Sequence, residues 1–523
     1  EGQNVRHLEP LGFIKFDILG LASLRMVEDC IRHILQRHEG VSEPDFKDVK
    51  SWYDKHLHPD VIDLNDQKIY KNIFHTGKWA GIFQFANSGA QNFCQKSKPK
   101  SIIDISAITS IYRPGPLSAG VDNQYVNAKN NPSSVKYIHK LIKEITKETH
   151  GFLIFQEQIA LLAHKLGKDL SLDEGNMLRK LLTKKGTAGK TYEKKKKIYD
   201  KFVAGCVEKS IDKSEAEKLW QTFEYFSGYG FNKSHAVSYS ILSYQCAYLL
   251  NYYPSEWLAA FLDKEPEDKK AKAISIARSL GYTIKTTDIN TSGKVWEIDG
   301  KTLIQPLTSI KGLGAVAIEQ IIANRPFNSV EDLLFNENIS YSKLNKKGLD
   351  VLARSQTLDC LMDDRFSGLK HFWSAVAVDR PKTKKKLDEN IEVYDNEGDF
   401  TTEEKIHYLD SLTGVYPIEM VVDKAMTDNF EKYKIPPLGE FDPALKIAWF
   451  IPKEIVEKKT KHGKIYWIVK TIDGSSKLNS IKCWGVKEGQ QLALNKPYMA
   501  KLDYNSKWGF STRSIKYSFK LVG

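Results

Sequence analysis

The stretch that decides the fold is GYGFNKSHAVSYSILSYQCAYLLNYYPSEWLAAF, residues 228–261. It opens with a glycine-containing turn and continues with Asn, Lys, Ser and His at 232–235. A helical pattern then runs from Ala236, with apolar and aromatic residues at three- and four-residue steps, until Pro254 ends it. Ser234 is predicted to cap this helix. Because unpaired amides and the helix dipole favour negative charge at a helix start, the cluster suits a polyphosphate. The alternative is an aromatic core helix with an ordinary cap, which this stretch alone favours.

The composition is that of a large globular protein with an excess of positive charge. A chain of 523 residues, 41% of them hydrophobic, is too long for one core, so several domains are expected. Lys and Arg (77) outnumber Asp and Glu (65), which gives a net charge of +12. This excess indicates a polyanionic partner, nucleic acid first and an anionic membrane surface second.

Cysteine usage and hydropathy predict the compartment. Six scattered cysteines form no CxxC pair, which argues against a zinc site and a disulfide framework and indicates a reducing compartment. Residues 1–10 are polar and do not resemble a signal peptide. The longest apolar stretch, 236–262, carries Ser, Gln, Asn and Pro, so we expect a buried helix and no membrane span. We therefore expect a cytoplasmic protein that does not bind membranes.

A short strand is predicted near the start, in LGFIKFDILGL at 11–21. Alternation places Phe13, Lys15 and Asp17 on one face of this strand. A Lys and an Asp on one sheet face form a small charged constellation. The alternative is an intrastrand ion pair on a solvated surface.

Basic side chains gather in two further places. Arg113 stands in IYRPGP, whose prolines and glycine stiffen the chain; the alternative is an exposed Arg in a surface turn. Between Arg179 and Lys201 there are ten basic residues and two acidic ones, and Arg179 and Lys180 fall one helical turn before Lys184. A Lys run is usually a solvated face, and we weigh contact with a nucleic-acid backbone equally.

Three modules are predicted from residue patterns further along the chain. FLIFQEQIALLAHKLG (152–167) is an amphipathic core helix, and LTSIKGLGAVAIEQIIANR (307–325) is a helix–hairpin–helix. The turn amides of the hairpin, at Gly312 and Gly314, and Lys311 can reach a DNA phosphate without reading sequence. From about residue 443, five β-prone runs suggest a small closed barrel. Its aromatic residues suit stacking on single-stranded bases, or else fill the barrel core; they are Trp449, Tyr466, Trp467, Trp484 and Trp508.

The chain resembles the alpha subunit of bacterial DNA polymerase III, the C-family of replicative polymerases, in motifs that follow the family's order over nearly the whole chain. The motifs are FIKFDILGL (13–21), GIFQFANSG (81–89), IYRPGP (111–116), FLIFQEQ (152–158), the RK…TKKG helix (179–186), the 228–261 stretch, IKGLGAVAIEQI with RPFNSVEDLL, HYLDSLTGVYP (407–417) and KKTKHGKIYWIVKTIDG. Any one of them could be chance, but their order is not.

The resemblance implies a fold class and a domain order. We expect a multidomain α+β protein with a mainly helical fingers domain, a helix–hairpin–helix module, a C-terminal β-barrel of the OB type and an N-terminal strand that completes a pol-beta-like palm. The expected segments are the end of the palm (1–27), the fingers (28–295), the hairpin and duplex-binding region (296–365), a linker with limited helix and a clamp-binding region (366–442), and the barrel (443–523). The clamp-binding peptide of the family has no clean match, and QTLDCL (356–361) is a weak one.

The resemblance also implies template-directed DNA synthesis on primer–template DNA with dNTPs. The reaction is nucleotidyl transfer with two Mg²⁺ ions, or Mn²⁺ in their place. Asp17 would be the catalytic and metal-binding carboxylate, and Lys15 would lie near the incoming phosphates. The other side chains expected around the triphosphate are those of Arg113, Arg179, Lys180, Lys184, Lys185, Asn232, Lys233, Ser234 and His235.

The sequence departs from the family pattern in one respect, because the two further palm aspartates of a PD-x-D motif are absent upstream of Asp17. One carboxylate cannot hold two divalent ions in good geometry. We therefore expect this chain alone to be inactive and an upstream polymerase half to supply the aspartates, as in a split polymerase of the kind that would suit a large bacteriophage. The alternative is a non-catalytic DNA-binding replisome scaffold, which has no use for Lys15, Asp17 and the 232–235 cluster. A nucleotide-binding regulator is disfavoured because no Walker-type loop is present.

Overall fold

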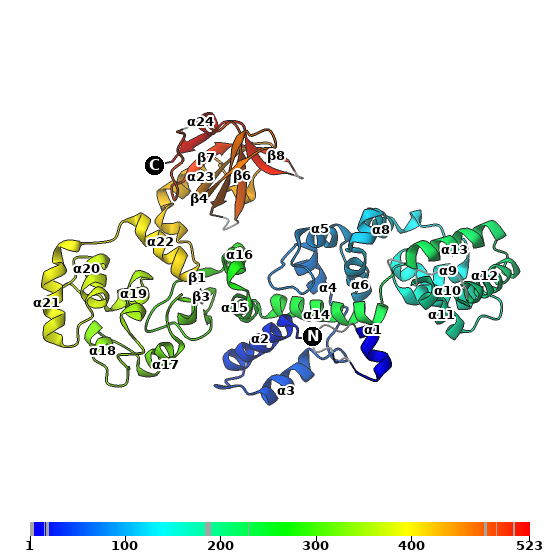
Figure 1. Cartoon of the computed structure of the whole chain (residues 1–523), viewed down its shortest axis with the longest axis horizontal. Helices are drawn as coiled ribbons and strands as arrows, with labels where there is room; N and C mark the ends of the chain where they lie inside the picture. Colours follow the sequence, from blue (N-terminus) through cyan, green and yellow to red (C-terminus); the bar gives the residue numbers. More distant parts are fainter. Residues whose placement is uncertain are drawn as a thin grey trace. The chain divides into compact units, whose positions relative to one another are not determined.

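The computed structural model describes residues 5–14, 16, 20–183, 190–227, 230–474, 478–487, 489–505 and 508–522. The chain divides into two compact units, Glu1–Trp257 and Leu258–Gly523, and the boundary falls inside helix α15 (Pro254–Lys264). Figure 1 follows the chain from the helices of the first unit to the C-terminal barrel.

The first unit is helical, and among its described residues the one β-type pairing is a bridge between Phe155 and Phe231. Its helices are α1 (Val5–Leu8), α2 (Ala22–His38), α3 (Phe46–His56), α4 (Gln67–Ile69), α5 (Ser88–Ser97), α6 (Ile102–Ile111), α7 (Pro114–Ser118), α8 (Val121–Asn130), α9 (Lys140–Thr146), α10 (Gln156–Leu166), α11 (Leu172–Thr183), α12 (Lys190–Glu208), α13 (Lys213–Ser227) and α14 (Lys233–Tyr252).

Helix α14 is the central element of this unit. Every residue from Leu242 to Ala247 is buried, so the middle of the helix is surrounded by protein on all sides. The buried polar groups are satisfied: the Tyr244 hydroxyl donates to the Asp63 carbonyl at 2.7 Å, and the Ser106 hydroxyl of α6 lies 3.0 Å from that of Ser240. The core-helix interpretation is thus confirmed for the middle of α14, and Pro254 does end the run, because it opens the next helix.

The predicted core helix at 152–167 is confirmed as α10, which packs with α11, α12 and α13 around a shared apolar cluster that includes Leu162, Leu178 and Phe202. Helix α11 comes close to α10 at Gly175, where a Cβ atom would lie only 2.5 Å from the Ala160 carbonyl oxygen. A glycine is needed there for the two helices to approach.

The strand predicted at 11–21 is not formed by the described part of that segment. Leu11 ends a 3-10 turn (Glu9–Leu11), and Phe13, Ile14 and Phe16 belong to no strand. Lys15 and Asp17 lie outside the described residues. An apolar alternating segment becomes a strand only when a neighbouring strand satisfies its backbone, and the described residues offer none here.

After the end of α15, the second unit continues with α16 (Glu267–Ser279) and a small three-stranded sheet. Strand β1 (Thr283–Lys285) pairs parallel to β3 (Thr302–Ile304), which pairs antiparallel to β2 (Glu297–Asp299). The predicted hairpin follows, but its first helix is only a 3-10 turn (Leu307–Ser309). Helices α17 (Ala315–Asn324), α18 (Val330–Leu334) and α19 (Lys346–Arg354) complete this module.

Residues 366–442 contain more helix than the linker that their composition suggests. They form α20 (Leu369–Trp373), α21 (Lys384–Tyr394), α22 (Thr402–Thr413) and α23 (Lys424–Lys432). Apolar side chains such as Phe372 and Leu387 belong to the same core as those of α17 and α19. The charged residues of this segment mask a helical pattern in which few positions face inward, as in α21, where Leu387 and Asn390 are buried.

The C-terminal region forms a curled seven-stranded sheet of the OB type, in the order β10-β7-β4-β5-β6-β9-β8. Strands β7 (Tyr498–Lys501) and β8 (Asp503–Asn505) are separated only by Leu502, so one nearly continuous strand pairs with β4 (Ile447–Lys459) at one end and with β9 (Gly509–Thr512) at the other. The remaining strands are β5 (Ile465–Ile472), β6 (Asn479–Cys483) and β10 (Phe519–Leu521).

One of the five predicted runs in the barrel is corrected by the structure. The last run, residues 514–523, is not one strand, because it splits into helix α24 (Ile515–Ser518) and the edge strand β10. The closing strand is the short β9, which pairs parallel to β6. Its Gly-Phe-Ser-Thr sequence is too short and too polar to stand out as a strand.

The six cysteines are free thiols. Among the helices of the described residues, none has the length and apolar content needed to cross a bilayer.

Candidate nucleotide-binding site

The start of α14 is joined to the start of α10 by a short parallel β-bridge. The Phe231 amide donates to the Ile154 carbonyl at 3.1 Å, and the Gln156 amide donates to the Phe231 carbonyl at 2.9 Å. Gly230 allows the close approach, since a Cβ atom there would lie 3.0 Å from the Gln156 side chain of α10. Segments far apart in the sequence therefore lie side by side at this point.

Helix α14 begins two residues earlier than the predicted cap implies. Its N-cap is Asn232, whose side-chain oxygen accepts from the His235 amide at 2.8 Å. The predicted cap, Ser234, is wrong: it lies inside the first turn, and its hydroxyl donates to the Asn232 side-chain oxygen at 2.7 Å. Asn is as good a cap as Ser, and only its position decides between them.

Three of the predicted cationic side chains reach this junction from different elements. The Arg113 guanidinium lies 4.7 Å from the centroid of the Phe231 ring. Arg179 of α11 lies 3.5 Å from the side-chain oxygen of Gln156 and 3.7 Å from the carboxylate of Glu157. The Lys233 ammonium is also near, 5.6 Å from the Phe155 ring. The structure thus brings Arg113, Arg179 and Lys233 together.

The remaining predicted residues are distributed as follows. His235 is exposed at the same helix start, with its ring 5.4 Å from that of Phe231 and 4.0 Å from that of Tyr239. Lys180 is exposed and follows Arg179 on α11. The residues that lie outside the described part of the chain are Lys15, Asp17, Lys184 and Lys185.

Two carboxylates that the sequence reasoning did not single out complete the junction. Glu157 accepts from the Lys233 amide at 2.9 Å and from the Asn232 side-chain amide at 3.0 Å, and Glu148 binds the Lys233 ammonium at 2.6 Å. The signal for Glu157 was present in the motif FQEQ, whose middle two residues Gln156 and Glu157 both contact the α14 start. Glu148 stands in an ordinary polar stretch and carried no signal.

A buried ion pair supports the helix that delivers Arg113. Asp104 of α6 lies 2.6 Å from the Lys129 ammonium, both side chains are 8% exposed, and the same carboxylate accepts from the Lys100 amide at 2.7 Å. Burial alone would raise the pKa of Asp104, but the His150 ring and the Lys129 ammonium outweigh it and hold that pKa at about 2. The Asp104–Lys129 pair ties α6 to α8, and the Ser106–Ser240 hydrogen bond ties α6 to α14. Arg113 follows at the end of α6 in the extended conformation that a following proline imposes.

The predicted hairpin site lies in the second unit. Gly312 has φ of +96° and Gly314 precedes α17, whose first turn has no side-chain cap. The Lys311 amide donates to the Leu412 carbonyl at 3.0 Å, which ties the turn to α22. A Cβ atom on Gly312 would lie 3.3 Å from the Lys347 side chain, so a second lysine lies beside the turn.

The weak clamp-peptide match at 356–361 is built into the core of the hairpin module. Leu358 is 0% exposed and Leu361 is 3% exposed. Their side chains are therefore not presented to a partner.

The barrel aromatics fall into two groups. Trp449 is buried and stacks on Phe430, so it belongs to the core. Tyr466 stacks on Trp484 with ring centroids 4.6 Å apart, and the exposed Trp508 has the Lys482 ammonium 5.3 Å from its ring. Trp484 and Trp508 are exposed, and their stacking on bases stays a prediction. The Trp467 ring N–H donates to Glu457 at 3.3 Å.

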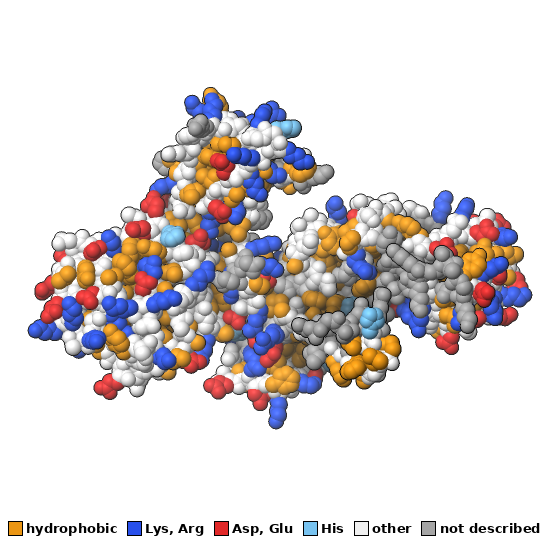
Figure 2. Space-filling model, in the orientation of Figure 1, with side chains coloured by type: hydrophobic (Ala, Val, Ile, Leu, Met, Phe, Trp, Pro, Cys, Tyr) orange, Lys and Arg blue, Asp and Glu red, His pale blue; other side chains and the backbone are white. Residues whose placement is uncertain are grey.

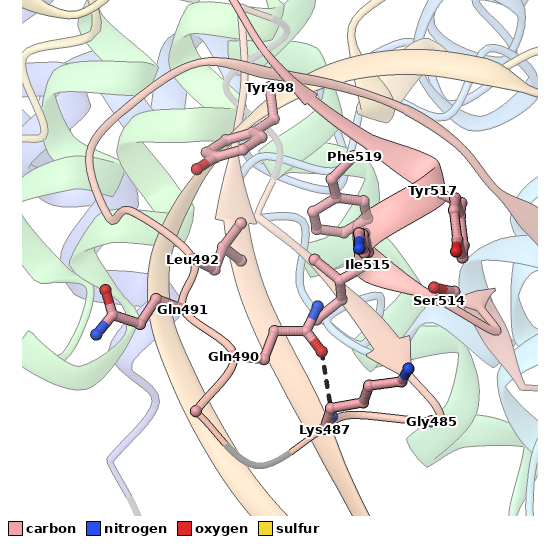
Figure 3. Close-up of a pocket in the computed structure, with 12 residues that line it drawn as sticks. Gly485, Lys487, Gln490, Gln491, Leu492, Tyr498, Ser514, Ile515, Tyr517 and Phe519 are labelled. Atoms are coloured by element: carbon pink, nitrogen blue, oxygen red, sulfur yellow. Dashed lines mark hydrogen bonds between the residues drawn. The ribbon is translucent and has the colours of Figure 1, made fainter.

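A pocket of about 400 Å³ lies elsewhere in the barrel, between the loop after β6 and helix α24 (Figure 3). Leu492, Ile515 and Phe519 form its apolar wall, and the Gln490 side chain accepts from the Lys487 amide at 3.2 Å across its rim. None of the predicted site residues lines it. Among the described residues, no group of three His, Cys, Asp or Glu side chains is placed to hold a metal ion.

Comparison with known proteins places these features in a family. The model for "Bacterial DNA polymerase III alpha subunit finger domain" matches residues 44–210, and the model for "Helix-hairpin-helix motif" matches residues 281–367. This chain is homologous to a C-terminal portion of the bacterial DNA polymerase III alpha subunit. The DNA polymerase III alpha subunit of Campylobacter jejuni is 32% identical over 360 residues, 68% of this chain and 28% of the relative, and that of Borreliella burgdorferi is 34% identical over 395 residues, 73% and 32%.

The alignment to the Chlamydia pneumoniae subunit is longer, at 28% identity over 498 residues, 90% of this chain and 38% of the relative. The chain therefore spans about a third of the length of these DNA polymerase III relatives. Arg113 and Arg179 fall inside the matched finger domain, and the α14 start lies beyond it.

Proposed function

We propose that this chain provides the fingers, hairpin and barrel of a replicative DNA polymerase that extends primer–template DNA from dNTPs in the cytoplasm of a bacterial cell. The observation that carries the proposal is the convergence of Arg113, Arg179 and Lys233 on the start of α14. Guanidinium, ammonium and helix-start amides are the groups that bind phosphate oxygens. They would hold the triphosphate and stabilise the charge that develops on the leaving pyrophosphate. We infer that Lys180, Lys184, Lys185 and His235 line the same site.

The metal-binding part of the proposal depends on Asp17 and on a second polypeptide. Asp17 would be one ligand of the Mg²⁺ pair, which activates the primer hydroxyl and neutralises phosphate charge when bound. The two further carboxylates would come from an upstream polymerase half. An exposed apolar surface supports a partner at this end, because Leu11, Phe13, Ile14 and Phe16 are 64–82% exposed. Figure 2 shows apolar side chains gathered in the region where Figure 1 places α1. Surfaces of this kind mark protein contacts.

Primer extension tests the proposal. The chain alone is expected to be inactive, and the chain with an upstream polypeptide that carries the palm aspartates is expected to extend a primer. Lys233→Ala in this mixture should lower kcat/KM for dNTPs by about tenfold to a hundredfold, the effect of a lost charge-assisted hydrogen bond. The control is Lys168→Ala, which removes a lysine that pairs with Glu208 in the same unit and should leave the rate unchanged.

The metal role and the scaffold alternative are tested in the same mixture. Asp17→Asn should abolish extension while duplex binding stays nearly unchanged, and loss of duplex binding would count against a metal-binding role. Should the mixture bind DNA but never extend the primer, the non-catalytic scaffold would be the better description. In that case the hairpin at Lys311, Gly312 and Gly314 would be the functional part of the chain.

A further inference from the structure

The start of α14 already holds a negatively charged group of the protein itself. The Glu157 carboxylate accepts from a backbone amide of the first helical turn, from the Asn232 side-chain amide and, at 3.7 Å, faces the Arg179 guanidinium. Backbone amide, side-chain amide and guanidinium are also the donors that a phosphate oxygen takes. The Glu148 carboxylate forms an ion pair with the Lys233 ammonium at 2.6 Å, so this donor is also held by a carboxylate of the protein.

We propose that Glu157, with Glu148, is a placeholder anion that keeps the triphosphate donors in position and must be displaced by the incoming nucleotide. This inference rests on the proposed function of the same site. Arg179 and Lys233 each face one carboxylate here, and the Arg113 guanidinium lies over the Phe231 ring beside them, so the local charges nearly balance. An anion with one or two charges gains little by displacing a carboxylate. A triphosphate carries more charge and can engage several donors at once, so it gains more.

The partial exposure of the two carboxylates and of Lys233 is consistent with contacts that can exchange. The side chains of Glu157, Glu148 and Lys233 are 33%, 34% and 32% exposed, so water can hydrate the carboxylates once they swing away. The ion pair at Asp104 in the same unit is different, because both of its side chains are 8% exposed and it has no such route. Ion pairs whose side chains are about one-third exposed are weak enough to be replaced by a better ligand.

The test is titration calorimetry on the full chain at low ionic strength, with inorganic tripolyphosphate and inorganic phosphate as probes. Glu157→Gln keeps the shape of the side chain but removes its charge. We expect tripolyphosphate to bind Glu157→Gln about threefold to tenfold more tightly than the wild type, and phosphate to gain at least as much, so that discrimination between the two anions falls. Glu148→Gln should act in the same direction with a smaller effect.

Two further variants separate the possible failures. Glu174→Gln is the matched control, because Glu174 also accepts from a backbone amide (Ser171, 2.9 Å) and pairs with a lysine (Lys201, 2.8 Å) in the same unit, and it should not change binding. Lys233→Met should lose tripolyphosphate binding. If Lys233→Met binds like the wild type, the triphosphate site itself is wrong.

If Lys233→Met loses binding but Glu157→Gln binds no more tightly than the wild type, the placeholder role is overturned while the site stands. Glu157 would then be a structural tie between α10 and α14. A lower melting temperature of Glu157→Gln with unchanged anion discrimination would point the same way. Absence of binding to every variant would overturn both proposals.

Discussion

The helix starts of α14 and α17 carry the same unpaired amides but are completed in opposite ways. At α14, Asn232 and Glu157 accept from amides of the first turn, and helix α6 packs beside it. At α17, Gly314 offers no side-chain cap and the preceding turn is exposed. Under the proposed function, one local element, a helix start, would serve two kinds of anion. A capped start favours a ligand with enough charge to compete, and an open start suits any backbone phosphate.

The largest effect is expected from removing the buried Asp104–Lys129 ion pair, which supports helix α6 beside the α14 start. Lys129→Met removes the ammonium from the buried Asp104 carboxylate and leaves the His150 ring, 3.8 Å away, as the neighbouring basic group, which should cost about 3–5 kcal/mol of local stability. Hydrogen exchange of the α6 amides should rise accordingly, and Arg113 should lose its fixed position. The control is Lys140→Met at an exposed position on α9, for which exchange should not change. Equal exchange in both variants would mean that the buried pair does not hold α6.

The second effect is the pH dependence of the stability that the Asp104 carboxylate gives to α6. The pKa of Asp104 is about 2 in the folded chain, below its unfolded value near 4. A depressed carboxyl pKa contributes stability that is present above pH 4 and is lost as the pH falls toward 2, here about 2 kcal/mol. Stability of α6 followed by hydrogen exchange should therefore decline from pH 4 to pH 2. The Asp104→Asn variant should start lower and lack this decline, and an unchanged acid profile would contradict the assignment.

The smallest effect is expected at the other helix start, in the hairpin turn before α17. Gly312→Ala places a Cβ atom at φ of +96° and 3.3 Å from the Lys347 side chain, which should cost about 1 kcal/mol. Duplex affinity measured by fluorescence anisotropy should fall about twofold to fivefold as the turn distorts. Gly314→Ala is the matched control, because nothing lies within 4 Å of its Cβ position and its φ is −79°. Identical losses in both variants would contradict a role for the turn geometry.

Much of the architecture follows from local patterns in the sequence. The α14 helix with its stop at Pro254, the core helix α10, the hairpin glycines and most barrel strands carry period and turn signals that tertiary contacts reinforce. The errors arise where the outcome depends on a distant partner. Asn232 is the N-cap instead of Ser234, because Glu157, which is distant in the sequence, binds the Lys233 amide and fixes the helix start there.

The same reasoning explains the other differences between prediction and structure. The closing strand β9 is defined by its pairing with β6 and not by its own short sequence. The helices of 366–442 are stabilised by the apolar core of the hairpin module, which composition does not reveal. The family resemblance predicted that Arg113, Arg179 and Lys233 surround one triphosphate, but the carboxylates Glu148 and Glu157 that contact Lys233 and Arg179 are tertiary facts that no local pattern showed. The placement of Lys15 and Asp17 stays a prediction.

The most direct test of the central claim is a lysine-acetylation footprint of the chain with and without saturating dATP, read by mass spectrometry. We expect dATP to slow the labelling of Lys233 and to leave that of Lys168, which pairs with Glu208, unchanged. Labelling of Lys233 at the same rate in both samples, while dATP is bound, would contradict a triphosphate site at the start of α14.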